Sequence, residues 1–289
     1  MLKIRFRYLL LPFMIFCSFM FSGKKRKIVF GPPGTILVRD TIFMDQFEIT
    51  NEDYKEYINW LKEKYGNEEP YIIKKNLPDT NVWRDPLNYN EALVGLYFSH
   101  PAYRNYPVVG VSYRQAMDYC RWRTDWAMAY CMKEAKSDKK KLLPANIESF
   151  YYRLPTVHEW EFAAYGGLDS TLNPFGYPYL DDTVHIDKVW VKKQYDDKIG
   201  MNSSDETMPV NYALPNPYGF YCMIGNLAEM TSEKGVSKGG SWRDYLDQCH
   251  VRDSITFAAP SSWLGFRCVC VVKYKSGYDA VSGKKLSKK

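Results

Sequence analysis

The chain has 289 residues, 46% hydrophobic and 25% charged, which is enough to bury the core of one large domain or two small ones. Its net charge of +6 comes from its ends, because residues 1–27 and 273–289 hold thirteen of the 39 basic residues. The body between them carries about six more acidic than basic residues. An acidic body lacks the basic surface that binds the phosphate backbone of a nucleic acid, which argues against nucleic-acid binding.

The N-terminus has the pattern of a secretory signal peptide. A basic start that includes Lys3 precedes an apolar run of 14 residues, Tyr8–Phe21, and a small residue follows at Ser22. The run is shorter than the roughly 20 residues of a membrane-spanning helix. We therefore expect residues 1–23 to be removed from an exported protein. An uncleaved anchor and lipidation at Cys17 are the alternatives.

The rest of the chain shows no internal repeat and no long low-complexity linker. We expect a basic linker at 24–30, one domain at 31–272 and a basic tail at 273–289. The tail is typical of a solvated end, and its alternative role is contact with an anionic surface.

Three helices are predicted from capping boxes, in which two side chains three residues apart satisfy the first free amides. An apolar stripe at helical spacing follows the first cap. The capping pairs are Thr50 with Asp53, Ser112 with Gln115, and Thr156 with Glu159, and the stripe is Tyr54, Tyr57, Ile58 and Leu61.

Two glutamates follow the third cap, Glu159 and Glu161. Residues two apart on a helix face different sides, which argues against an acid/base pair. We expect Glu159 to close the capping box and Glu161 to pair with Arg153.

Strand-like runs are few and short, at Thr35–Val38, Gly235–Lys238 and Cys268–Val272. Pro and Gly recur through Gly166–Gly240, a composition typical of irregular loops. The pattern predicts an α+β domain, rich in loops, with short strands and a few capped helices.

The chain has seven cysteines, six of them outside the predicted signal peptide. Export permits disulfides, but the spacing assigns no pair, and the absence of CxxC argues against structural zinc. We expect buried free thiols at Cys120 and Cys131. Cys268 and Cys270 alternate with one residue between them and should lie on one face of a strand.

Several motifs, in matching order and spacing, resemble the formylglycine-generating-enzyme-like (sulfatase-modifying factor) family. This resemblance implies a single domain with that family's loop-rich fold, related in shape to C-type lectins. The motifs are FEITNEDYKEYI at Phe47–Ile58, YPVVGVSYRQAMDYCRWRT at Tyr106–Thr124, RLPTVHEWEFAAYGG at Arg153–Gly167, NPYGFYCMIGNLAEMTS at Asn216–Ser232, GGSWRDYLDQCHVRDS at Gly239–Ser254 and LGFRC at Leu264–Cys268.

The oxidase of that family holds copper between two cysteines that follow GGS. Ser241 and Cys249 match its pattern, but Asp244 stands at the first cysteine. A carboxylate is a hard ligand and a poor partner for Cu(I). We therefore expect no catalytic residues, no required cofactor and no copper. If the chain were active, the resemblance would assign the chemistry to Cys249, Ser241 and Asp244.

The family's enzyme also holds calcium, through a side-chain oxygen, loop carbonyls and a glutamate. Gly225, Leu227 and Glu229 match those positions, whereas Cys222 replaces the first ligand. Calcium prefers several oxygen ligands and a thiol is a poor one. The resemblance makes calcium a candidate ligand here, and the alternative is a turn held by hydrogen bonds from Asn226 and Glu229.

The segments Gly31–Asn51 and His100–Tyr113 resemble family members of the type IX secretion and gliding machinery. The resemblance implies an exported, non-catalytic scaffold or binding protein in the periplasm or at the outer-membrane periphery. Its partners would be envelope proteins, and it would reach the membrane through them or through its N-terminus. Two alternatives stay open: a divergent oxidoreductase of protein cysteine that uses copper or another metal, and a lectin-like binding module.

Overall fold

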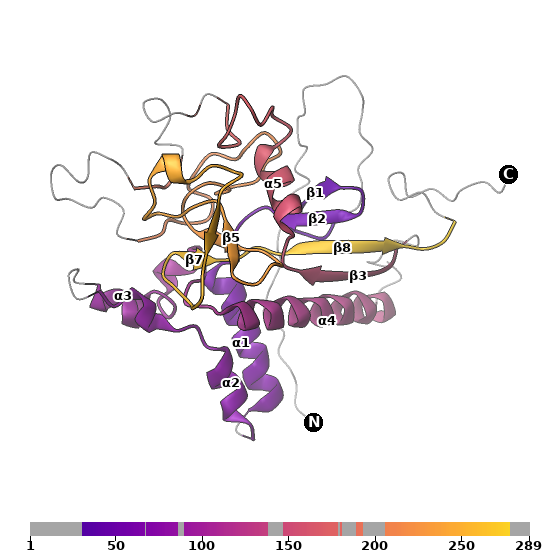
Figure 1. Ribbon diagram of the computed structural model, residues 1–289. Coiled ribbons are helices and arrows are strands. Elements are labelled where there is room, and N and C mark those ends of the chain that lie inside the picture. The colour runs from indigo at the N-terminus through magenta and orange to yellow at the C-terminus, as the bar shows by residue number, and fades with distance from the viewer. Residues whose placement is uncertain are drawn as a thin grey trace.

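The computed structural model describes residues 31–66, 68–85, 90–137, 147–178, 180, 189–192 and 206–277 (Figure 1). The predicted signal peptide at 1–23, the linker at 24–30 and most of the basic tail lie outside the described residues. Within those ranges, no helix combines the length and apolar character that a membrane crossing requires.

Helices come mainly from the first half of the described chain and short strands from its two ends. The elements in chain order are β1 (Thr35–Arg39), β2 (Ile42–Asp45), α1 (Asn51–Tyr65), α2 (Pro70–Asn76), η1 (Thr80–Trp83), α3 (Glu91–Leu96), η2 (Pro101–Tyr103), α4 (Tyr113–Ser137), β3 (Ile147–Arg153), α5 (Val157–Tyr165), β4 (Ala228–Met230), β5 (Val236–Lys238), η4 (Leu246–Gln248), β6 (Ser254–Thr256), β7 (Leu264–Gly265) and β8 (Val269–Tyr274).

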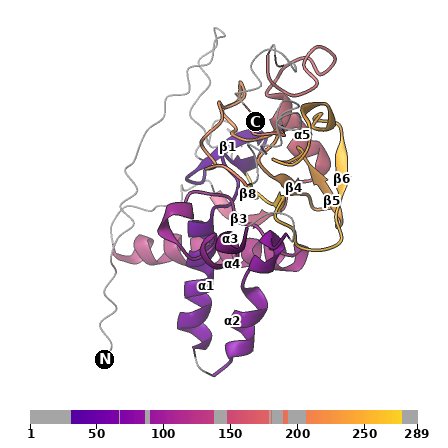
Figure 2. The same cartoon turned by 90° about the vertical axis from the view of Figure 1, so that its left-hand side faces the viewer.

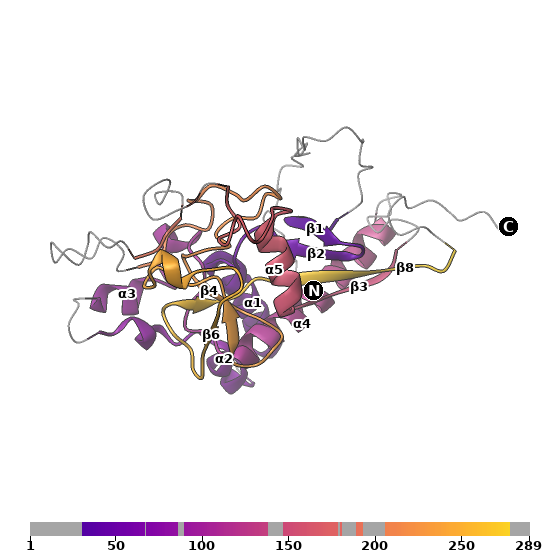
Figure 3. The ribbon, with the colours of Figure 1, turned by 45° about the horizontal axis from the view of Figure 1, so that its top comes forward.

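Two four-stranded sheets organise the fold. The first has the order β1-β2-β8-β3 with antiparallel neighbours, and the second has the order β6-β5-β4-β7 with β4 and β7 parallel. Helix α4 runs beneath β8 and β3, while α5 lies above the sheet beside β1 and β2 (Figure 1). Seen from the top, α5 crosses over the start of β8 (Figure 3). Helices α1 and α2 descend side by side on the far side of α4 (Figure 2).

All three capping boxes are confirmed. The hydroxyl of Thr50 accepts from the amide of Asp53 at 3.1 Å, and the Asp53 carboxylate accepts from the Thr50 amide at 3.0 Å. Thr156 and Glu159 repeat this exchange at the start of α5, and Ser112 with Gln115 does so before α4. The predicted stripe on α1 is buried. Local sequence therefore fixes where these helices begin and which face they bury.

The expected pairing of Arg153 with Glu161 is wrong. Arg153 binds the carboxylate of Glu159 through two nitrogens, at 2.6 and 2.7 Å, while Glu161 accepts from Lys238 of β5 at 2.9 Å. Glu159 lies in the first turn of α5 and faces back toward β3. Glu161 is two residues further on and faces the second sheet, as the helical rotation requires.

The alternation predicted for β8 is confirmed. Cys268 and Cys270 are buried in the hydrophobic cluster that α4 covers, whereas Val269 between them belongs to the cluster around Trp160 of α5. Cys120 is buried as expected, but Cys131 is only half-buried. Cys131 lies in the second half of the 25-residue helix α4 and packs against the edge of the cluster that encloses Cys120.

Candidate functional site

The GGSW turn that follows β5 is built by two glycines in the left-handed region. A Cβ on Gly239 would lie 2.7 Å from the carbonyl oxygen of Met223, and one on Gly240 would lie 2.1 Å from the sulfur of Cys249. Both backbones have positive φ, 95° and 69°. A side chain at either position would be strained and would collide with its neighbours. The two glycines therefore serve close packing of the turn against the loop that carries Cys249.

Asp244, at the position of the oxidase's first cysteine, closes this turn. Its carboxylate accepts from the hydroxyl of Ser241 at 2.5 Å, and its amide donates to the carbonyl oxygen of Ser241 at 3.1 Å. Its own carbonyl oxygen accepts from the amide of Lys192 at 2.9 Å. Ser241 is buried and Asp244 half-buried. The structure thus places Ser241 and Asp244 together, and their side chains are hydrogen-bonded to each other within the turn.

Cys249 is a buried thiol. Its sulfur donates to the carbonyl oxygen of Tyr245 at 3.2 Å. Burial raises the pKa of this thiol well above its usual range, and the nearby charge of Asp244 raises it further. Cu(I) in a linear site binds two thiolates, and the carboxylate of Asp244 in place of one of them does not fit that site. Across the described residues, no three His, Cys, Asp or Glu side chains are grouped to hold a metal.

The glutamate of the candidate calcium loop is already paired with an arginine. Both oxygens of Glu229 accept from Arg267, at 2.5 and 2.6 Å, and one also accepts from the indole of Trp160 at 2.8 Å. The two charged side chains are 1% and 0% exposed. Gly225 and Leu227 lie in the turn before β4, and Arg267 supplies the charge that calcium would bring to Glu229. The carboxylate therefore does not fit the predicted calcium role, and calcium binding by the chain stays an untested prediction.

Arg267 uses all its donor nitrogens. Besides Glu229, it donates to the carbonyl oxygens of Asp45 and Gln46, at 3.2 Å each, and of Tyr221 at 2.9 Å. These contacts join the end of β2, the loop after Asn216 and strand β4. Bidentate guanidinium–carboxylate pairs combine strength with fixed geometry. One buried arginine thus holds the loop that the family uses for an ion.

A second buried carboxyl, Glu48, lies beside this pair and was not singled out from the sequence. It is 1% exposed, and its carboxyl accepts from the side-chain amide of Asn226 at 3.0 Å. Burial raises the pKa of Glu48 well above its usual range, and the negative charge of Glu229 adds to the shift. The thiol of Cys222 and the charge of Arg267 favour the ionised form less strongly. The sequence offered one sign of this buried carboxyl, which is that Glu48 stands between the apolar residues Phe47 and Ile49.

Replacing Glu48 by Gln is expected to remove a loss of stability that the wild-type chain shows as pH rises. Because the folded-state pKa of Glu48 is raised above the unfolded value of about 4.3, the folded state binds more protons in the window above that value. The free energy of unfolding therefore falls as pH rises from there toward the raised pKa. Urea unfolding from pH 4 to 8 should show this extra slope in wild type and not in Glu48→Gln.

Glu63→Gln, on the exposed side of α1, is the matched control and should follow the wild-type curve. Parallel curves for wild type and Glu48→Gln would contradict the assignment of a raised pKa to this carboxyl.

Exposed residues, among them Arg243 and Asp247, follow the GGSW turn in the chain. The backbone of 189–192 bridges two loops, because Lys192 bonds to Asp244 and the carbonyl oxygen of Trp190 accepts from the Asn226 amide at 2.7 Å. Tyr212 packs edge-on against Trp190 with ring centroids 5.8 Å apart. Tyr212 and its neighbour Leu214 are 52% and 54% exposed. These contacts through residues 189–192 link the loop that carries Tyr212 to the turn at Asp244.

The short-stranded sheets, the capped helices and the glycine-built turn define a formylglycine-generating-enzyme-like fold. Residues 18–272 match the family described as "Sulfatase-modifying factor enzyme 1-like domain". The chain belongs to this family, and the fold class predicted from sequence is confirmed.

Its relatives include proteins named as enzymes and proteins named as inactive. It is 25% identical to "Formylglycine-generating enzyme" of Mus musculus, over 82% of this chain and 68% of the mouse protein. It is 26% identical to "Inactive C-alpha-formylglycine-generating enzyme 2" of Bos taurus, over 82% of this chain and 79% of the bovine protein. Family membership alone therefore does not decide between catalysis and binding.

Two solved structures share the fold. CarF superposes with a TM-score of 0.52 at 20% identity, over 85% of this chain and 95% of CarF. Treponema denticola variable protein 1 superposes with a TM-score of 0.50 at 20% identity, over 80% and 84% of the two chains. At this identity the likeness concerns the fold and carries no function to this chain.

Proposed function

We propose that this protein is an exported, non-catalytic member of the family that binds other proteins of the cell envelope. The binding surface consists of Trp242–Asp247 together with the exposed side chains of Tyr212 and Leu214, and we call it the turn surface. The proposed location is the periplasm or the outer-membrane periphery. The proposed setting is a type IX secretion or gliding assembly, which rests on the likeness of the segments Gly31–Asn51 and His100–Tyr113.

The proposal rests on the residues at the two metal-binding positions of the turn, Asp244 and Cys249, and on their hydrogen bonds. The Asp244 carboxylate accepts from the hydroxyl of Ser241, and the thiol of Cys249 donates to the backbone carbonyl of Tyr245. Oxidation of a peptide cysteine on copper needs two thiolates that hold a soft metal. Asp244 replaces one of these thiolates, so the two positions do not supply the two-sulfur site that this chemistry needs.

The turn surface has features of a protein-binding patch. Tyr212 offers an exposed aromatic ring with a polar end, and Leu214 adds apolar area beside it. Asp247 and Arg243 are exposed charges at the edge of the patch. Interface centres favour aromatic side chains, while charges at the rim set orientation and association rate. Because Asp244 is tied to Ser241, Asp247 is the acidic group better placed to meet a basic side chain of a partner.

Site-specific cross-linking in intact envelopes tests this proposal. A photoreactive side chain at Tyr212 should give a small number of discrete cross-linked envelope proteins, and Asp247→Arg should weaken them. The matched control is the same probe at Tyr71, which is 65% exposed on α2. Helix α2 lies at the far end of the molecule from the turn surface (Figure 1).

Equal cross-linking from Tyr212 and Tyr71, or none from Tyr212, would contradict the proposed surface. In the second case, a glycan array tests the lectin-like alternative, in which binding lost on replacement of Tyr212 by Ala would locate the ligand on the same patch.

A further inference from the structure

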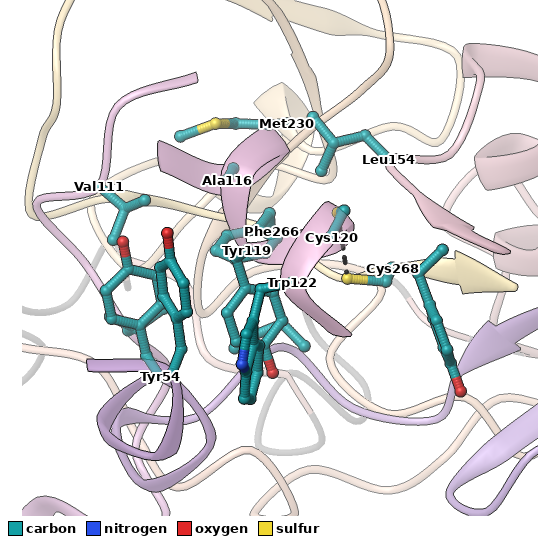
Figure 4. Packing of buried hydrophobic residues seen from close by; sticks show 14 of the residues in the cluster. Tyr54, Val111, Ala116, Tyr119, Cys120, Trp122, Leu154, Met230, Phe266 and Cys268 are labelled. Carbon is teal, nitrogen blue, oxygen red and sulfur yellow. Dashed lines mark hydrogen bonds between the residues drawn. The ribbon is translucent and has the colours of Figure 1, made fainter. Parts of the chain in front are cut away.

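Helix α4 changes its surroundings halfway along. In its first half, Tyr119, Cys120 and Trp122 lie within the hydrophobic cluster that α4 shares with α1 and the first sheet (Figure 4). In its second half, Trp126 and Tyr130 are 46% and 49% exposed, and their nearly parallel rings have centroids 5.8 Å apart. Helices α1 and α2 descend from beside the first half (Figure 1). The second half therefore presents two large aromatic rings to solvent.

The end of α4 meets the two longest strands of the first sheet. Strand β3 begins opposite the end of β8, with Ser149 in register with Lys273. The end of α4 lies with the start of β3 and the end of β8 at one end of the molecule, and the view from the top shows the same arrangement (Figures 1 and 3). This end lies away from β5, the strand that precedes the GGSW turn (Figure 1).

Two lysine-rich stretches, far apart in sequence, come together at this end. Lys133 and Lys136 stand in the last two turns of α4, and residues 273–289 hold six lysines and one acidic residue. The ammonium of Lys273 donates to the carboxylate of Glu148 at 2.8 Å, yet its side chain stays 65% exposed. The body of the chain carries more acidic than basic residues. The fold thus gathers positive charge at one end of an acidic domain.

We propose that this end of the molecule is a docking surface for an anionic lipid bilayer. The surface, which we call the basic end, consists of Trp126, Tyr130, Lys133 and Lys136 of α4 together with residues 273–289. Each lysine close to an anionic bilayer is attracted to the headgroup phosphates, and Trp and Tyr side chains are favoured where lipid meets water. This attachment is separate from the turn surface and from any anchor at the N-terminus.

The kind of positive charge favours lipid over an acidic protein. Every basic residue of the basic end is a lysine. The planar guanidinium of arginine suits the fixed carboxylates of a protein interface, whereas a lysine ammonium is a hydrated point charge on a flexible stem. A fluid array of headgroups offers no fixed geometry and needs only such point charges. Where the chain makes fixed pairs with two hydrogen bonds it uses arginine, in Arg123 with Asp45 and Arg153 with Glu159.

Co-sedimentation of the full mature chain with lipid vesicles tests the proposal. We expect binding to mixed phosphatidylglycerol–phosphatidylcholine vesicles and far weaker binding to phosphatidylcholine alone. Added salt should release the protein, because the Debye length falls from about 10 Å at 0.1 M salt to about 3 Å at 1 M. Replacing Lys284, Lys285, Lys288 and Lys289 by Gln should lower the vesicle affinity on the order of 100-fold. Replacing the same four by Arg should preserve it.

The basic linker provides a control with matched charge. Replacing Lys24, Lys25, Arg26 and Lys27 by Gln removes the same four charges from the opposite end of the chain. This variant should lose far less affinity than the tail variant. Equal losses in the two variants would contradict a localised basic end, because net charge alone would then explain the binding.

A third variant tests whether the two stretches act together. Replacing Lys133 and Lys136 by Gln should lower the vesicle affinity on the order of tenfold, with an unchanged melting temperature as evidence of folding. Binding by the tail alone predicts no change in this variant, and that result would overturn the proposed surface. So would the absence of binding to the anionic vesicles. Tighter binding to a soluble poly-glutamate peptide than to vesicles of equal charge concentration would overturn it too, in favour of an acidic protein partner.

Discussion

Replacing Arg267 by Met is expected to lower the free energy of unfolding by about 3–5 kcal/mol, because it leaves Glu229 charged, buried and without its partner. The pair is almost completely excluded from solvent, and the guanidinium also satisfies three backbone carbonyls. Without the guanidinium, these carbonyl oxygens have no donor at this position, and each buried acceptor left unsatisfied lowers the stability of the fold. Urea unfolding followed by circular dichroism measures the effect.

Arg84→Met is the matched control. Arg84 also makes two hydrogen bonds to one carboxylate, that of Glu91, at 2.7 and 3.1 Å. The two side chains are 54% and 70% exposed, so solvent screens their attraction and the urea midpoint should hardly move. Equal, small losses in Arg267→Met and Arg84→Met would contradict the view that the buried arginine organises the loop.

Replacing Gly240 by Ala is expected to lower the free energy of unfolding by about 2–5 kcal/mol. An added Cβ would lie 2.1 Å from the sulfur of Cys249 and 2.9 Å from its Cβ, so the tight packing must open. The backbone φ of 69° adds the strain of a left-handed alanine, about 1–2 kcal/mol. Urea unfolding of purified variants gives the difference directly.

Gly34→Ala separates the two contributions. Gly34 also has a left-handed φ, 74°, but no atom lies within 4 Å of an added Cβ. This variant should show only the strain of about 1–2 kcal/mol. If Gly240→Ala costs no more than Gly34→Ala, the second glycine of the turn is not needed for close packing against Cys249.

The parts of the fold that local sequence determines could be predicted. Thr50, Ser112 and Thr156 begin their helices as expected, because a capping box involves residues only three apart. The alternation of Cys268 and Cys270 was predictable for the same reason, since a strand repeats every two residues. The strands β4 and β6 have three residues each, too few to show the two-residue alternation of a strand in the sequence.

The chemistry of the site depends on long-range contacts that no local pattern records. Arg267 and Glu229 are 38 residues apart, and Glu48 and Asn226 are 178 apart. The match of Glu229 to a calcium ligand gave no sign that an arginine would bind both its oxygens. Likewise, the motif around Cys120 gave no sign that its sulfur lies 3.4 Å from the sulfur of Cys268.

The replacement of a cysteine by Asp244 was readable directly from the sequence, because it is a change of residue at one position. The sequence did not predict which hydrogen bonds the residues around Asp244 make. Ser241 donates to Asp244 and Cys249 donates to the carbonyl oxygen of Tyr245, and no local pattern in the sequence records either hydrogen bond.

We propose that this domain keeps the family's fold without its oxidation chemistry. The most direct measurement incubates the purified, full mature chain with a cysteine-containing sulfatase peptide, Cu(I) and dioxygen, and analyses the peptide by mass spectrometry. An active formylglycine-generating enzyme under the same conditions is the positive control. We predict that this chain leaves the peptide cysteine unchanged. Formation of the aldehyde by the wild-type chain, lost in Cys249→Ser, would contradict the account.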